Sequence, residues 1–154
     1  MDLKTIILTT DLSENASAAT PYAVALAKKF GSAVHWVHVF EEPHLYSGVA
    51  DGILIGVSSW VSEAHRASQK NLTEMAKALA DREQIEVKPV VLRGNVLTEI
   101  LKYAEKESVG CIVTATHGRT GLSHAVHGSV AERIVRLSTC PVLSVRPKTI
   151  QPGK

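Results

Sequence analysis

Short apolar runs alternate with stretches of helical periodicity along most of the chain. Five runs rich in apolar residues are typical of strands: 6–8, 33–40, 85–92, 110–114 and 142–145. Between them, apolar residues recur three and four positions apart, which predicts four helices: 16–30, 61–82, 96–106 and 130–137. The pattern therefore predicts strands and helices that follow one another in turn.

Helix-end signals refine two of these predictions. The first helix either begins near Thr20 with Pro21 in its first turn, or starts earlier and bends at Pro21. Gly31 is expected to end it, because glycine accepts the left-handed conformation that closes many helices. Asn95 is expected to cap the helix 96–106.

Residues 41–59 interrupt the alternation. Pro43, Gly48, Gly52 and Gly56 predict an irregular loop there, although apolar residues also occur between positions 53 and 57. A loop of this length inside a compact domain is usually functional or mobile.

The order of the elements predicts the fold class. Strands that alternate with helices favour an α/β domain, in which a parallel sheet is covered by helices on both faces. We expect one such domain over residues 1–147 and a loose tail over 148–154. Ligands of these sheets bind beyond the carboxyl ends of the strands, where the strand order reverses.

Composition excludes several classes of partner. The chain has 45% hydrophobic and 21% charged residues and a net charge of +2, which gives no reason to expect nucleic acid as a partner. No apolar run is long enough for a membrane span, and no secretory signal is visible at the start. Cys111 and Cys140 are too few for a disulfide framework and are expected to be reduced thiols in a cytoplasmic protein.

A glycine-containing segment supplies the main chemical hypothesis. Residues 114–129 follow the strand 110–114 and precede the last helix, and they include Gly118, Arg119, Gly128 and Ser129. A glycine loop before a helix start lets backbone N–H groups approach a phosphate. Glycines in such a place also occur for turn geometry alone. The segment is neither a P-loop nor a dinucleotide fingerprint, because the required lysine and the position after the first strand are missing.

Two other groups of residues have competing interpretations. Asp11 ends the first strand, where it is a turn residue or accepts a hydrogen bond from a nucleotide hydroxyl or helps to hold a metal ion. His117, His124 and His127 raise a metal hypothesis, but no Cys or acidic partner stands at zinc spacing. Histidines that face solvent or orient the loop are the preferred interpretation.

Three segments together resemble the universal stress protein family. That family's signature is Gly, two residues, Gly, nine residues, Gly and then Ser or Thr; Gly118, Gly128 and Ser129 fit it, while Ala115 replaces the first glycine. The opening around Ile7 to Asn15 and the closing run 140–146 also look like the family's first and last strands. The resemblance implies a flavodoxin-like, Rossmann-like open sheet of five parallel strands in the order 3-2-1-4-5.

The resemblance also implies an ATP site, with magnesium on the phosphates and Asp11 as the residue expected to help to hold it. It places the first set of residues around the base and sugar: Thr9, Thr10, Asp11 and Val39. The second set surrounds the phosphates: Gly118, Arg119, Gly128, Ser129 and Val130. Thr114, Ala115 and His117, at and just after the end of the fourth strand, are also expected to contact the nucleotide. The methyl group of Ala115 is expected to crowd the ribose side of this pocket slightly.

The implied function is that of an ATP-binding regulatory protein of a stress response, acting on an unidentified protein partner. The alternative is an interaction module of the same fold with no nucleotide. No catalytic residue is evident, so at most slow ATP hydrolysis is expected. The strand 142–145 is expected at the sheet edge, where an unpaired apolar strand predicts a homodimer, as the resemblance also implies.

Overall fold

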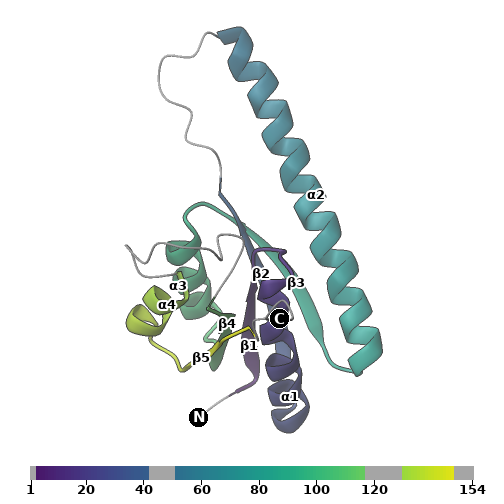
Figure 1. Cartoon of the computed structure of the whole chain (residues 1–154), viewed down its shortest axis with the longest axis vertical. Helices are drawn as coiled ribbons and strands as arrows, with labels where there is room; N and C mark the ends of the chain where they lie inside the picture. The colour runs from purple at the N-terminus through teal and green to yellow at the C-terminus, as the bar shows by residue number, and fades with distance from the viewer. Residues whose placement is uncertain (1–2, 42–50, 117–129, 148–154) are drawn as a thin grey trace, which may run out of the picture.

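Five parallel strands form the centre of the structure, a computed structural model that describes residues 3–41, 51–116 and 130–147. The strands lie in the order β3-β2-β1-β4-β5 (Figure 1). Their bounds are β1 Thr5–Thr10, β2 Ala33–Phe40, β3 Val87–Arg93, β4 Cys111–Ala115 and β5 Val142–Val145. The predicted parallel sheet and its strand order are therefore confirmed.

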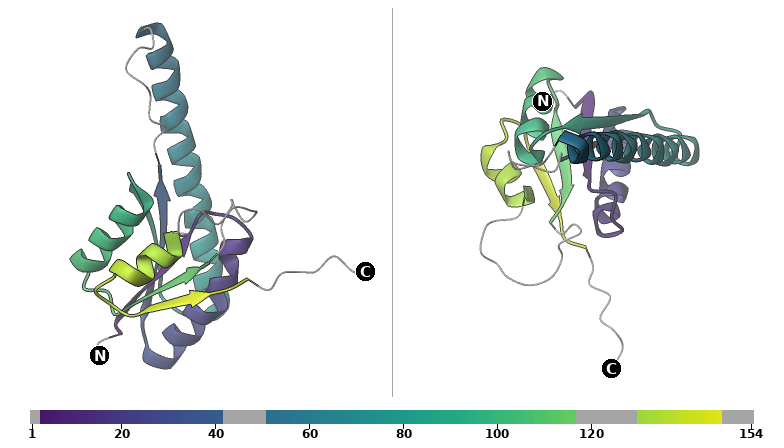
Figure 2. Two further views of the ribbon diagram at one scale, coloured as in Figure 1. Left: turned by 60° about the vertical axis from the view of Figure 1, so that its left-hand side comes forward. Right: turned by 90° about the horizontal axis from the view of Figure 1, so that it is seen from above.

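Helices cover both faces of this sheet (Figures 1 and 2). The helical elements are the 3-10 helix η1 Asn15–Ala19 and four α-helices, α1 Thr20–Phe30, α2 Asp51–Glu83, α3 Val96–Lys106 and α4 Val130–Leu137. The first core cluster joins α1 and α2 to one sheet face through residues such as Ala23 and Leu72. The second core cluster joins α3 and α4 to the other face through Ile100 and Ile134.

Side chains of β1 alternate between the two clusters. Ile6 and Leu8 belong to the first cluster and Ile7 to the second, and all three are fully buried. A strand buried on both faces has no polar side to alternate with, which explains the continuous apolar run in the sequence.

The start of α1 agrees with one of the two alternatives for Pro21. The α-helix begins at Thr20 with Pro21 in its first turn, where a missing backbone N–H costs nothing. The preceding residues form the separate helix η1. Gly31 ends α1 with φ of 67°, in the left-handed region that favours glycine.

The predicted loop 41–59 is wrong over its second part. Helix α2 begins at Asp51 and runs for 33 residues, so 51–59 are helical, while 42–50 lie outside the described residues. Gly52 and Gly56 each cost a helix about 1 kcal/mol relative to alanine, but they do not forbid it. The three-and-four spacing of apolar residues continues upstream through Val61 and Val57, and this periodicity prevails over the glycine signal.

The two outer strands are β3 and β5. Strand β3 contains Pro89, which an inner strand would not tolerate. The Glu86 carbonyl accepts a hydrogen bond from Val34 of β2, so every second residue from Glu86 onward faces β2. The backbone nitrogen of Pro89 therefore faces the open edge of the sheet. No neighbouring strand needs a hydrogen-bond donor there, so the missing N–H of proline costs no hydrogen bond. Within the three described segments, no helix has the combined length and apolarity of a membrane span.

One partly buried polar pair links the sheet to α3, with His35 buried and Tyr103 half-buried. Nδ1 of His35 lies 3.0 Å from the Tyr103 hydroxyl. Burial lowers the pKa of His35 below its usual value, the nearby charge of Lys88 adds to this, and Glu107 and Glu86 oppose it. Burial, followed by the charge of Glu107, raises the pKa of Tyr103 to about 12. Both groups are therefore held neutral over a wide pH range.

We expect this pair to limit stability at both pH extremes. Because the folded pKa of His35 is lowered, the unfolded chain binds more protons, and the free energy of unfolding falls as pH drops below about 6.5. Because the folded pKa of Tyr103 is raised to about 12, stability also falls as pH rises above about 10. Urea denaturation across pH measures both slopes.

Two substitutions separate the contributions. His35→Asn should flatten the acid slope and leave the alkaline one, while Tyr103→Phe should do the reverse. Acid and alkaline slopes equal to those of the unmodified protein in both variants would contradict the assignment.

Candidate functional site

The chain leaves the adjacent strands β1 and β4 toward opposite faces of the sheet. Strand β1 continues into η1 and α1 on the face of the first core cluster, whereas the helix after β4 is α4, on the other face. These two strands are paired through Leu8 and Val113. Their carboxyl ends thus form the switch point at which ligands bind in open α/β sheets.

Two threonine hydroxyls meet at this switch point. Oγ1 of Thr9 donates to Oγ1 of Thr114 over 2.8 Å, and both residues are buried. Oγ1 of Thr114 in turn lies 3.5 Å from the Ala115 carbonyl oxygen, to which it donates. The pair satisfies two hydroxyls that would otherwise be costly to bury.

The turn after β1 is held by its own polar side chains. Oδ1 of Asp11 accepts hydrogen bonds from the Ser13 backbone N–H at 3.0 Å and from the Ser13 hydroxyl at 2.5 Å. Oγ1 of Thr10 accepts the Leu12 N–H at 2.9 Å, and Leu12 has a φ of 64°. Asp11 therefore has the turn role that was one of its three interpretations, at the strand end where the two ligand-binding roles would also be performed.

The end of β2 is tied to the end of β1. Nδ1 of His38 lies 3.0 Å from the Thr10 carbonyl oxygen, and the His38 ring is buried. The next residue, Val39, is also buried and packs in the second core cluster with Leu97 and Ile100 of α3. The ends of β1 and β2 thus form one connected edge, and Val39 lies on its α3 side.

Helix α3 begins at the same edge. Oδ1 of Asn95 accepts the Thr98 N–H at 3.2 Å, which confirms the predicted cap. Gly94 donates to the Phe40 carbonyl oxygen at 3.2 Å and has φ of 128°, a conformation that side chains rarely adopt. A Cβ atom there would lie 3.1 Å from Cγ of Glu99, so glycine lets the chain turn closely from β3 into α3.

Ala115 lies on the opposite face of the sheet from the threonine pair. Thr9 alternates with Ile7 along β1, which belongs to the second cluster, and Thr114 alternates with Ile112 in the same way. Ala115 packs instead against the first cluster, together with Leu143. The expectation that its methyl group crowds the ribose side is therefore not supported by the direction in which that group packs.

The structure brings about half of the predicted site residues together. Six of them lie at the carboxyl edge of β1, β2 and β4: Thr9, Thr10, Asp11, Val39, Thr114 and Ala115. Val130 is the exposed first residue of α4. The other five fall outside the described residues: His117, Gly118, Arg119, Gly128 and Ser129.

Sequence reasoning missed two residues that support this edge, Ser13 and His38. A serine two positions after an aspartate is a recognisable turn signal, so Ser13 was accessible from sequence. His38 was not, because its partner is a backbone oxygen 28 residues away. Among the described residues, no group of three or more His, Cys, Asp or Glu is placed to hold a metal ion. His117, His124 and His127 lie outside them.

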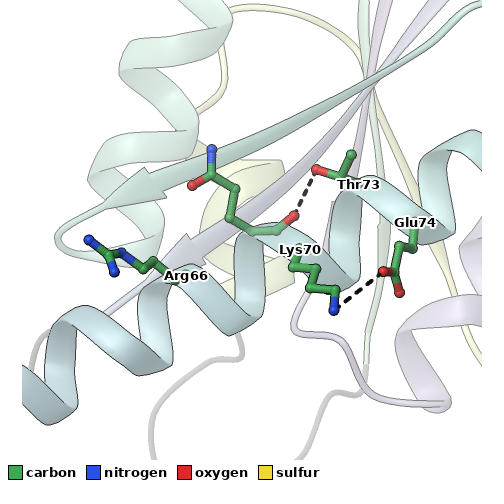
Figure 3. A pocket seen from close by; sticks show the side chains of 5 residues that line it. Arg66, Lys70, Thr73 and Glu74 are labelled. Atoms are coloured by element: carbon green, nitrogen blue, oxygen red, sulfur yellow. Dashed lines mark hydrogen bonds and ion pairs between the residues drawn. The ribbon is translucent and has the colours of Figure 1, made fainter.

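A shallow hollow on α2 is a second place to consider (Figure 3). It is lined by exposed residues of this one helix: Arg66, Gln69, Lys70, Thr73 and Glu74. Lys70 and Glu74 form an ion pair at 3.9 Å, and Thr73 donates to the Gln69 carbonyl oxygen. One helix surface cannot enclose a ligand, so the strand ends remain the candidate site.

Comparison with known proteins agrees with the fold. The family model described as "Universal stress protein family" matches residues 2–146. Universal stress protein MJ0577 of Methanocaldococcus jannaschii is 32% identical over 155 residues, covering 94% of this chain and 96% of that protein. MJ0531 of the same organism is 31% identical over 145 residues, covering 93% and 82%. A solved MJ0577 structure has a TM-score of 0.82 at 28% identity, covering 97% of this chain and 99% of that one.

The threonine pair predicts an asymmetric double-mutant cycle. Thr114→Val leaves the buried Thr9 hydroxyl without its acceptor and should lower the free energy of unfolding by about 1–3 kcal/mol. Thr9→Val should cost less, because Thr114 keeps its contact with the Ala115 carbonyl oxygen. The double variant should be more stable than the sum of the two costs by about 1 kcal/mol. Urea denaturation of the four proteins measures the cycle, and strictly additive costs would refute the coupling.

Proposed function

This chain belongs to the universal stress protein family, and from that membership and the geometry of the strand ends we propose that it is an ATP-binding regulatory protein. The nucleotide is held between the carboxyl ends of β1 and β4. The base and ribose lie near Thr9, Asp11 and Val39, and the phosphates lie toward the N-terminus of α4. Magnesium accompanies the phosphates, and Asp11 is the carboxylate that would help to hold it.

The observation that carries this proposal is the buried hydroxyl pair of Thr9 and Thr114 at the switch point. Beside it, the Asp11 turn places a carboxylate at the same strand end, where ribose hydroxyls find acceptors. Helix α4 begins at Val130, directly after Gly128 and Ser129 in the sequence. The N–H groups of a helix start favour phosphate, which supplies the other half of a nucleotide site.

Ligands of more distant relatives support an adenine nucleotide. A universal stress protein structure in complex with cAMP has a TM-score of 0.64 at 14% identity. One from Archaeoglobus fulgidus in complex with dAMP has a TM-score of 0.61 at 17% identity. Both ligands contain adenine, a ribose-type sugar and phosphate, which are the three parts of a nucleotide that the proposed site would bind.

Regulation by the nucleotide is the function that these residues support. ATP would connect the ends of β1 and β2 to the start of α4, which belong to different layers of the fold. Binding would thereby favour one arrangement of this edge, and a protein partner that prefers that arrangement binds more tightly. No step of hydrolysis is needed, and slow hydrolysis is the most that the proposed residues support. The competing function is an interaction module that uses the same edge without nucleotide.

A homodimer through β5 belongs to the same proposal. Strand β5 is the last strand of the described sheet, and β4 is its neighbour on the inner side. The Pro141 and Val145 carbonyl oxygens accept hydrogen bonds from Ile112 and Thr116 on the β4 side. Residues therefore alternate in direction, and the exposed Ser144 turns its backbone groups outward. A second β5 can pair there about a twofold axis.

ATP titration tests the nucleotide site. Calorimetry with ATP and magnesium is expected to show saturable binding, and Gly128→Asp should abolish it because a carboxylate would repel the phosphates. Gln69→Asp adds the same charge at an exposed position of α2 and should bind like the unmodified protein. Ala115→Gly should keep the affinity within about threefold, since its methyl group packs in the first core cluster.

The outcomes distinguish the two functions. A flat titration for both the unmodified protein and Ala115→Gly would support the interaction module and overturn the ATP site. Binding that appears only in Ala115→Gly would identify Ala115 as the residue that closes the pocket.

Blocking the outward edge tests the β5 contact. Ser144→Pro removes an outward N–H without removing a donor to β4, so it should halve the mass of the assembly in sedimentation. Ser144→Ala keeps the N–H and should leave the mass unchanged. Lysine at Leu143 or Val145 is a poorer test, because both side chains pack against the first core cluster and the domain itself would be destabilised. An assembly mass that Ser144→Pro leaves unchanged would exclude this interface.

A further inference from the structure

Thr9 and Thr114 form the last row of side chains on one face of β1 and β4, the face of the second core cluster. Strand β1 ends at Thr10 and β4 ends at Ala115, and the side chains of these two residues alternate to the other face. Leu8 pairs with Val113, so Thr9 and Thr114 lie side by side in the next row. We refer to them as the hydroxyl pair. It is the part of this sheet face that borders the candidate nucleotide site.

The preceding row on the same face is apolar. Ile7 and Ile112 pair across β1 and β4, and both are fully buried. Replacing both partners of a buried hydrogen bond by apolar groups of the same shape is often nearly neutral for stability. The bond within the hydroxyl pair therefore adds little to stability by itself, and the polarity of the pair points to a polar ligand at the strand ends.

Both protons of the hydroxyl pair are already used within the protein. The Thr9 hydroxyl donates to Oγ1 of Thr114 over 2.8 Å, and the Thr114 hydroxyl donates to the Ala115 carbonyl oxygen over 3.5 Å. A hydroxyl has one proton and two acceptor positions. Within the described part of the chain, Thr9 thus keeps two acceptor positions and Thr114 keeps one. Toward a ligand, the pair can accept hydrogen bonds but has no proton to donate.

Burial makes this direction of hydrogen bonding selective. Thr9 is 9% exposed and Thr114 is 4% exposed, so water has little access to either hydroxyl. A carbonyl oxygen of a ligand placed against the pair would find no donor, and a buried polar group without a partner is costly. An N–H group of a ligand would instead be satisfied at the same place.

Val39 indicates which part of a nucleotide would reach the pair. It follows two residues after Val37, which pairs with Thr9, so it lies on the same face and about 7 Å closer to the carboxyl edge. Its apolar side chain suits the flat face of a base, whereas the start of α4 suits phosphate. A base that packs against Val39 can therefore turn its polar edge toward the hydroxyl pair.

We propose that the hydroxyl pair selects the base of the nucleotide by accepting a hydrogen bond from its exocyclic amino group. This inference rests on the nucleotide site proposed above and specifies the base that the site prefers. Adenine carries an amine at position 6, where guanine and hypoxanthine carry a carbonyl oxygen that can only accept. The pair thus favours ATP over nucleotides of 6-oxopurines.

Nucleotides that differ only at position 6 test this selection. Calorimetry with magnesium should show that the unmodified protein binds ATP at least about tenfold more tightly than purine riboside triphosphate, which lacks the amine and is otherwise the same molecule. ITP has a carbonyl oxygen at position 6 and should bind no better than purine riboside triphosphate.

Two valine variants change the pair in different ways. Thr9→Val removes the more exposed acceptor and should lower the affinity for ATP to that for purine riboside triphosphate. Thr114→Val leaves the Thr9 proton without its acceptor, so this proton can turn to a ligand oxygen and the order of ATP and ITP should reverse. Thr9→Ser keeps the hydroxyl and should keep the preference for ATP. Thr73→Val makes the same substitution at an exposed position of α2 and should change neither affinity.

The outcomes separate this inference from the proposed function. Equal affinities for ATP and purine riboside triphosphate in the unmodified protein would leave the ATP site in place and overturn the selection by the hydroxyl pair. A preference for ATP that survives both valine variants would overturn it as well, with urea denaturation verifying that each variant is folded. Absence of binding by all three nucleotides would overturn the proposed function and this inference with it.

Discussion

A parallel sheet must be covered on both faces, and this requirement determines where the protein can be polar inside. The chain covers the first face with α1 and α2 and the second with α3 and α4. It must therefore change sides, and the adjacent strands β1 and β4 send it in opposite directions. Apolar packing cannot be completed between two diverging connections. Thr9 and Thr114 lie there. The Thr9 hydroxyl donates to the Thr114 hydroxyl, which in turn donates to the Ala115 carbonyl oxygen.

Much of the fold could be predicted from the sequence because strand burial and helix periodicity are local properties. Ile6, Ile7 and Leu8 form a continuous apolar run since both faces of β1 are buried. Asn95 marks the start of α3 in the sequence, because its side chain caps the helix. The start of α2 was missed because two local signals disagree between Asp51 and Ser59. Glycine spacing is typical of a loop, whereas apolar spacing is typical of a helix, and the longer periodicity prevails.

The candidate site was harder to predict from the sequence than the fold, because its contacts join distant parts of the chain. Thr9 and Thr114 are separated by 105 positions, and only the register of β1 against β4 makes them neighbours. The face of the sheet toward which the Ala115 side chain points also depends on its position in the alternation along β4. A sequence motif identifies the residue types of a site, but it cannot assign a side chain to a sheet face until the register is known.

Strand β2 connects the candidate site to helix α2. At its end, His38 contacts the Thr10 carbonyl oxygen, Val39 lies on the α3 side of the site, and Phe40 contacts His65 of α2. Consecutive residues of one strand thus contact the site and helices on both faces of the sheet. If nucleotide changes the position of this strand end, it changes the contact between Phe40 and His65. Thermodynamic linkage then works in both directions: a protein partner that prefers the nucleotide-bound arrangement of α2 makes this chain bind nucleotide more tightly, by the same factor. A regulatory nucleotide would therefore have an output at α2 without any chemical step.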